Sequence, residues 1–184
     1  MNLKVLICYN IAYKGAICMF NIGENIVYGS NGVCRVENVG ILDSPGMPQD
    51  KEYYTLSPIY SKGSKIFTPV DNDKIIMRAV LGKDEAQELI DNIDNIEAMW
   101  IADEKSRELE YKEAIKACNC EELVKIIKTI YVRMQDRIAN GKKITASDEK
   151  YFRLAEDRLY GELAVSLDIP KEEVKEYIIE HCKI

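Results

Sequence analysis

Side chains that commonly carry catalytic chemistry are few in this sequence, and they form no recognisable constellation. The one histidine, His181, lies near the end of the chain beside Cys182, where a catalytic triad would lack partners. Cys118 and Cys120 offer two thiolates, which are too few ligands for a zinc-type site. The glycine spacings of the common nucleotide-binding loops do not occur. We therefore expect no catalytic residues, no metal and no cofactor.

A run of acidic side chains is better explained as a solvated surface than as a general acid and base, because it lies in a helical and charged context. These residues are Asp94, Glu97, Asp103, Glu104, Glu108 and Glu110. Among them stands Trp100, the only tryptophan of the chain. An indole beside basic side chains can be a core residue or can contact a partner, and the sequence leaves both alternatives open.

Length and composition fit a globular protein. The chain has 184 residues, of which 47% are hydrophobic and 30% charged, enough for one large core or two small ones. The six cysteines contain no CxxC pair, so we expect reduced thiols in a cytoplasmic protein. The apolar run from Val5 to Ile17 is interrupted by polar residues, and we predict neither a signal peptide nor a membrane span.

Charge is distributed unevenly around a net value of −6. Acidic residues outnumber basic ones by 13 to 5 between Leu81 and Glu122, whereas basic residues lead by 9 to 5 between Leu123 and Arg158. A local positive field can steer a polyanion even in an acidic molecule, although a solvated helix surface gives the same pattern.

The elements that would position these residues change type along the chain. Between Phe20 and Val80, five short apolar segments are separated by glycine-, proline- and aspartate-bearing turns, which predicts a small β-barrel. The segments are 24–28, 33–39, 52–60, 65–69 and 74–78. Residues 1–18 fit no pattern and are either an extension or an added strand. The predicted β domain therefore spans residues 19–80.

After Gly82 the hydrophobic spacing becomes that of helices, and residues 81–184 are predicted to form a compact α-helical domain. We expect an amphipathic helix over 84–100, a charged one over 103–117, and a third with Leu123, Ile130, Tyr131 and Ile138 on its inner face. Asn140 and Gly141 end the third helix, and Thr145 to Asp148 caps the next. A final short helix follows Pro170.

Three segments in order resemble the CarD/CdnL family of bacterial RNA polymerase-binding transcription regulators. The first is Phe20–Tyr28 with Gly32, and the second is Glu52–Leu56 followed by Ile66–Pro69. The third combines the helical block Leu123–Tyr131 with Thr145–Lys150 and Gly161–Ala164. Together they extend the resemblance from Met19 to about Leu167.

The resemblance implies a Tudor- or SH3-like barrel that docks on the RNA polymerase β subunit, and a helical domain that contacts promoter DNA at the upstream edge of the melted region. In such proteins a tryptophan inserts into the minor groove and helps to hold the open complex, and Trp100 matches it in type and position. The basic side chains Lys105, Arg107 and Lys112 follow about one helical turn later than in the family pattern.

The resulting expectations are specific. Polymerase binding is assigned to the strand segment Lys65, Ile66, Phe67 and Thr68, which could equally be an ordinary barrel strand. DNA binding, weak and largely independent of base sequence, is assigned to Trp100, Lys105, Arg107, Lys112, Lys128, Lys142, Lys143 and Lys150. The protein is expected to be a monomer without enzymatic activity. The alternative is a barrel-based adaptor whose helical domain binds another protein and not DNA.

Overall fold

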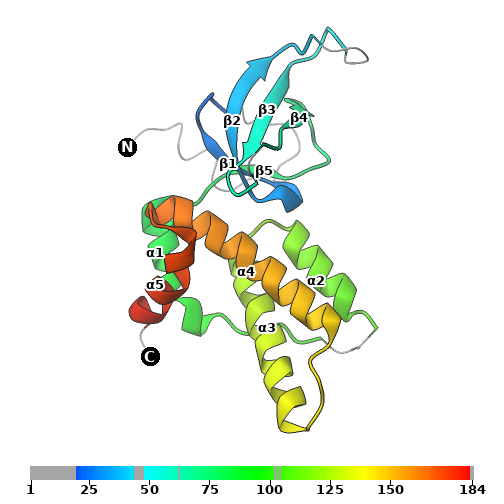
Figure 1. Ribbon diagram of the computed structural model, residues 1–184, viewed down its shortest axis with the longest axis vertical. Coiled ribbons are helices and arrows are strands. Elements are labelled where there is room, and N and C mark those ends of the chain that lie inside the picture. The colour runs from blue at the N-terminus through cyan, green and yellow to red at the C-terminus, as the bar shows by residue number, and fades with distance from the viewer. Residues whose placement is uncertain (1–19, 44–47, 62, 102, 104, 183–184) are drawn as a thin grey trace. The chain divides into compact units, whose positions relative to one another are not determined.

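The computed structural model describes residues 20–43, 48–61, 63–101, 103 and 105–182 (Figure 1). The chain divides into two compact units between Ala79 and Val80, next to the predicted domain boundary. The first is built from strands and the second from helices. The predicted extension over residues 1–18 lies outside the described residues.

The first unit is one antiparallel sheet. Strand β1 (Asn25–Tyr28) turns through the short 3-10 helix η1 (Gly29–Asn31) into β2 (Val33–Gly40). Gly29 has a φ of +45°, and a Cβ there would come within 2.6 Å of a side-chain carbon of Ile75, so only glycine fits this turn. The chain continues through β3 (Tyr53–Pro58), β4 (Ile66–Pro69) and β5 (Met77–Ala79).

The strand order is β4-β3-β2-β1-β5, with β4 and β5 at the two edges. All four pairings are antiparallel, and the register between β2 and β3 shifts between Val36 and Asn38. The predicted unit of five short strands is confirmed. Closure into a barrel is not seen, because no pairing joins β4 to β5 in the described part of the chain. Alternating apolar residues specify strands and their buried face, whereas closure depends on long-range pairing between the two edges.

One face of the sheet buries a small core. Its members are Phe20, Ile26, Tyr28, Cys34, Val36, Tyr54 and Leu56. The rings of Phe20 and Tyr54 lie 6.0 Å apart, and the Phe20 N–H donates to the Tyr54 hydroxyl over 2.9 Å. Tyr54 therefore fills the interior while its hydroxyl ties down the chain before β1.

The second unit contains five α-helices among its described residues. They are α1 (Lys83–Asp91), α2 (Arg107–Lys116), α3 (Cys120–Ala139), α4 (Ala146–Leu167) and α5 (Val174–His181). Two short 3-10 helices, η2 (Ile93–Asn95) and η3 (Lys171–Glu173), precede α2 and α5. The long helices α3 and α4 are joined by a short loop, and α4 contacts each of the other four α-helices.

Side-chain caps and a left-handed glycine define the ends of the long helices. The Asn119 side chain accepts hydrogen bonds from the N–H groups of Glu121 and Glu122 at the start of α3. The Thr145 hydroxyl accepts from the Asp148 N–H over 3.1 Å at the start of α4, which confirms the predicted cap. Gly141, with a φ of +69°, follows the end of α3 in the left-handed conformation.

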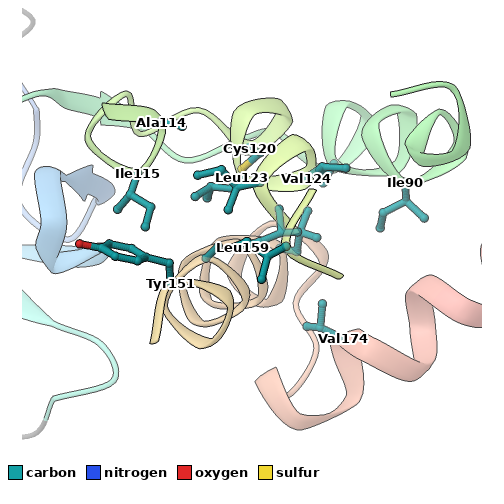
Figure 2. Close-up of a cluster of buried hydrophobic side chains, with 14 of the residues drawn as sticks. Ile90, Ala114, Ile115, Cys120, Leu123, Val124, Tyr151, Leu159 and Val174 are labelled. Carbon is teal, nitrogen blue, oxygen red and sulfur yellow. The ribbon is translucent and has the colours of Figure 1, made fainter. Parts of the chain in front are cut away.

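Apolar residues from all five helices meet in one core (Figure 2). Labelled in the close-up are Ile90 of α1, Ala114 and Ile115 of α2, Cys120, Leu123 and Val124 of α3, Tyr151 and Leu159 of α4, and Val174 of α5. No described cysteine forms a disulfide in the part of the chain that the structure covers. The helical unit is therefore held together by packing and by a few buried polar contacts.

Two of these contacts involve buried carboxylates. Asp148, only 1% exposed, accepts from the Arg133 Nε over 3.0 Å. The Tyr111 hydroxyl also approaches it, at 3.5 Å. Glu162, 2% exposed, accepts from the Leu81 N–H over 3.1 Å and from the Cys120 thiol over 3.2 Å. Removing one partner from such a group is strongly destabilising, because the carboxylate stays buried with fewer donors.

Two expectations about the helices are wrong. The stretch 84–100 is not one helix: α1 ends at Asp91, and Trp100 lies in irregular chain beyond η2. Ile93, Ile96 and Met99 still pack against the core, so the apolar spacing marks contact with the core without continuous helix. In α3, Tyr131 and Ile138 are 53% and 54% exposed and do not belong to the inner face.

Candidate functional site

Trp100 lies on the surface of the helical unit. Its side chain is 86% exposed, more than that of any other large hydrophobic residue that the structure describes. Tryptophan is highly buried on average, and burying an indole is strongly favourable, so this exposure is unusual. The structure thus excludes the core alternative for Trp100. An exposed indole on a folded unit is suited to contact with an apolar or stacked partner surface.

The segment just before Trp100 is fastened to α3. The Met99 N–H donates to the Thr129 hydroxyl over 2.7 Å. One residue earlier in α3, the Lys128 ammonium donates to the carbonyl oxygens of Ile93 and Ile96 over 2.6 and 2.8 Å, with the Asp94 carbonyl at 3.3 Å. Sequence reasoning assigned Lys128 to DNA, and the structure shows its ammonium directed at this backbone.

A basic cluster forms where α2 packs on α4. Lys112 makes an ion pair with Glu108 over 3.0 Å, and the Tyr151 hydroxyl donates to the same carboxylate over 3.0 Å. The Lys150 ammonium lies 5.0 Å from the centre of the Tyr151 ring. The hydrogen bond from Lys112 lowers the pKa of the Glu108 carboxyl most, and the hydrogen bond from Tyr151 lowers it further, so this pKa lies below its usual range. The structure thus brings Lys112 and Lys150 together around one partly neutralising carboxylate.

The other predicted DNA contacts are spread over the helical unit. Lys105 is exposed just before α2, and Arg107 is the first residue of that helix and half-buried. Lys142 and Lys143 are both exposed in the loop between α3 and α4. This loop is fixed at its base, where the Arg137 Nε donates to the Lys143 carbonyl over 2.9 Å. Its two ammonium groups are therefore presented on a defined turn.

The predicted polymerase contact lies on an edge strand. Ile66, Phe67 and Thr68 are in β4, which pairs only with β3 in the described sheet, and Lys65 immediately precedes it. Thr68 is buried on the core side, whereas Phe67 is 47% exposed. An exposed aromatic residue on an unpaired strand edge is a suitable place for another chain to add a strand.

The hydrogen-bonding pattern shows which groups this edge offers. The Val70 N–H donates to the Glu52 carbonyl over 3.0 Å, and Thr68 lies opposite Tyr54. Amide direction alternates along an antiparallel strand, so residues 66, 68 and 70 face β3. The backbone N–H and C=O of Phe67 therefore point to the outer edge, and the ring of the same residue is exposed on a face of the sheet.

Neither a metal centre nor a membrane segment is evident in the residues that can be described. No group of three or more histidine, cysteine, aspartate or glutamate side chains is arranged to hold a metal ion. Within the same residues, no helix is both long and apolar enough to cross a bilayer.

Comparison with known proteins agrees with the geometry of the sheet unit. In class, this unit is a small Tudor-like domain. In family, residues 20–81 match the CarD-like/TRCF RID domain, so the sheet unit is similar to this domain. The match supports a role in interaction with RNA polymerase. No curated protein matches the chain.

Proposed function

We propose that this protein is a non-enzymatic transcription regulator that docks on the RNA polymerase β subunit through β4 and contacts promoter DNA through Trp100. The observation that carries the proposal is the match of residues 20–81 to a domain whose relatives interact with RNA polymerase. In this proposal the protein acts as a monomer in the cytoplasm, and the DNA contact modulates open-complex stability.

The docking half of the proposal is supported by the outward-facing edge of β4. A strand of the β subunit would pair with the backbone of Phe67 and cover its ring, with Lys65, Ile66 and Thr68 flanking the contact. Main-chain hydrogen bonds supply affinity in such augmentation, and the side-chain pockets supply specificity.

Docking is tested with Phe67→Glu in a pull-down with purified RNA polymerase. A carboxylate at the edge should weaken binding strongly, because it would be buried against the added strand. Ile22→Glu is the matched control, since Ile22 is 63% exposed on the same unit but outside β4. Equal retention of both variants by polymerase would contradict docking through β4.

The DNA half is supported by the exposure of Trp100 and by exposed lysines on the same unit. An apolar wedge in the minor groove exploits a base step that is already distorted, as at the edge of a melted region. Lysines such as Lys105, Lys142 and Lys143 would hold phosphates without reading sequence, as would the cluster around Lys112 and Lys150.

Trp100→Ala is the direct test of this contact. It should shorten the lifetime of open complexes roughly 5- to 150-fold, the range given by about 1–3 kcal/mol per base–aromatic contact. Leu109→Ala, which removes a 59% exposed side chain from the same unit, should leave the lifetime unchanged. Polymerase binding should survive in both variants. An unchanged open-complex lifetime in Trp100→Ala would refute the wedge.

The second candidate, a protein adaptor, has one observation in its favour. Tyr131, Val132 and Ile138 are exposed apolar residues of α3, with 53%, 61% and 54% of their surface accessible. Photocrosslinking from position 100 in polymerase–promoter complexes distinguishes the two. Crosslinks to DNA support the regulator, whereas crosslinks to protein alone would support the adaptor.

A further inference from the structure

We propose that Lys128 and Thr129 are positioning residues for Trp100, which hold the segment 93–99 on α3 so that the indole is presented in one place. The proposal deepens the proposed function and rests on it for the link to DNA. It assigns Lys128 a role through the backbone of this protein, distinct from a phosphate contact.

The Lys128 ammonium satisfies the end of the short helix η2. A lysine has three donors, and here three carbonyl oxygens of residues 93–96 surround them, two within 2.8 Å. The Ile93 carbonyl also accepts the Ile96 N–H over 3.1 Å, so the lysine adds a second donor to it. Carbonyl groups at the end of a helical turn generally lack intrahelical partners, and positive charge there is favourable. Half-buried Lys128 thus fixes the backbone where the chain leaves η2.

The Thr129 hydroxyl fixes the other end of the segment. It donates its single hydrogen to the Lys125 carbonyl of its own helix over 2.6 Å. Its lone pairs are then directed outward, and one accepts the Met99 N–H. Two consecutive residues of α3 therefore hold both sides of a segment that ends next to Trp100.

The packing around the segment explains why such fastening matters. Ile93, Ile96 and Met99 lie only partly buried against the core, and Trp100 itself is almost fully exposed. Packing of the indole therefore contributes little to its placement. A mobile indole would lose conformational entropy each time it inserts between bases. A preorganised indole has lost that entropy on folding, so its insertion is less costly.

The experiment compares Lys128→Met, Thr129→Val and Thr129→Ser in the full chain. Methionine keeps most of the aliphatic stem and removes the donors, valine removes the hydroxyl at nearly constant volume, and serine keeps it. Lys125→Met is the matched control. Lys125 lies one turn earlier on α3 and pairs with Glu121 and Glu122 of the same helix.

Two readouts need no DNA. Hydrogen exchange of the Met99 amide should accelerate about 5-fold or more in Thr129→Val, the value for loss of roughly 1 kcal/mol. Lys128→Met should accelerate exchange across the same segment. Trp100 is the only tryptophan, so its time-resolved fluorescence anisotropy reports motion at this site alone, and should show faster local decay in both variants. Thr129→Ser and Lys125→Met should match wild type.

The third readout separates positioning from phosphate binding. A lysine that contacts a phosphate lowers the salt slope of DNA affinity by about one when it is removed. Lys128→Met should shorten open-complex lifetime by less than Trp100→Ala does and leave that slope unchanged. A lowered slope, or wild-type exchange and anisotropy in both Lys128→Met and Thr129→Val, would overturn the proposal. If Trp100→Ala has no effect on open complexes, the proposed function fails, whereas the exchange results still decide the positioning.

Discussion

At the scale of single residues, Tyr111 has the most clearly altered chemistry. Its ring is fully buried in the helical core, at 5.6 Å from the ring of Tyr151. Burial, and then the nearby Asp148 carboxylate, raise the pKa of Tyr111 to about 12. The neutral phenol is therefore strongly favoured in the folded protein.

This shift predicts a loss of stability in alkali. Above pH 10 the unfolded chain releases the Tyr111 proton, whereas the folded chain keeps it until about pH 12. Stability from this group is complete below pH 10 and is lost as the pH rises, by up to roughly 1.4 kcal/mol per pH unit. Tyr111→Phe should therefore show a shallower alkaline loss in urea unfolding. Parallel curves for the two proteins between pH 9 and 12 would contradict the prediction.

Sequence reasoning at this scale identified residue types better than their contacts. Trp100 was singled out because it is unique, and the structure settles its exposure. Lys128 was assigned to DNA because it lies in a basic helix, yet its ammonium contacts carbonyls more than thirty positions earlier in the chain. Such long-range side-chain to backbone contacts leave no periodic signal in the sequence.

At the scale of elements, β4 combines an outward-facing backbone with an exposed ring at one residue, Phe67. If a partner strand pairs with this edge, the Phe67 N–H is one of its donors. Proline at this position would remove the donor and disturb the pairing of β4 with β3 little, because edge strands tolerate proline where the N–H faces outward.

The expected result is a graded loss of polymerase affinity. Phe67→Ala removes the ring, and Phe67→Pro removes both the ring and the donor, so the proline variant should bind several-fold more weakly than the alanine variant. Circular dichroism serves to confirm that both retain the fold. Identical affinities for polymerase would indicate that the ring alone makes the contact.

The elements themselves were largely predictable, for identifiable reasons. The five strands follow from alternating apolar residues, and the start of α4 follows from the Thr145 cap. The predicted helix 84–100 fails because core contact through Ile93 and Ile96 continues the helical spacing after the helix has ended. The alternation of apolar residues does not predict whether the sheet is open or closed, because closure depends on pairing between the two edge strands.

At the scale of the whole molecule, the proposed function assigns polymerase docking to the sheet unit and DNA contact to the helical unit. The net charge of −6 opposes tight binding to DNA by the isolated protein, despite exposed lysines. Docking on polymerase would raise the effective concentration of the helical unit at the promoter without any new DNA contact.

This arrangement predicts that two variants fail in different ways. Phe67→Glu weakens docking, so this variant should reach the wild-type open-complex lifetime when its concentration is raised. Trp100→Ala removes the contact itself, so no concentration should restore the wild-type lifetime. Titrating each variant in a promoter-opening assay measures both the half-maximal concentration and the plateau. Recovery of Trp100→Ala to the wild-type plateau would refute the division of tasks.

The contact between Glu162 and the Leu81 N–H has a consequence for how the chain can be cut. Leu81 is the second residue of the helical unit, and its amide is bound to a carboxylate in the C-terminal half of α4. A fragment that begins at α1 would omit this donor and leave the buried Glu162 carboxylate with one hydrogen-bond partner fewer. The loss should lower the free energy of unfolding by about 1–3 kcal/mol. Isolated helical fragments should therefore begin at Val80 or earlier, so that a folding defect is not mistaken for a loss of DNA binding.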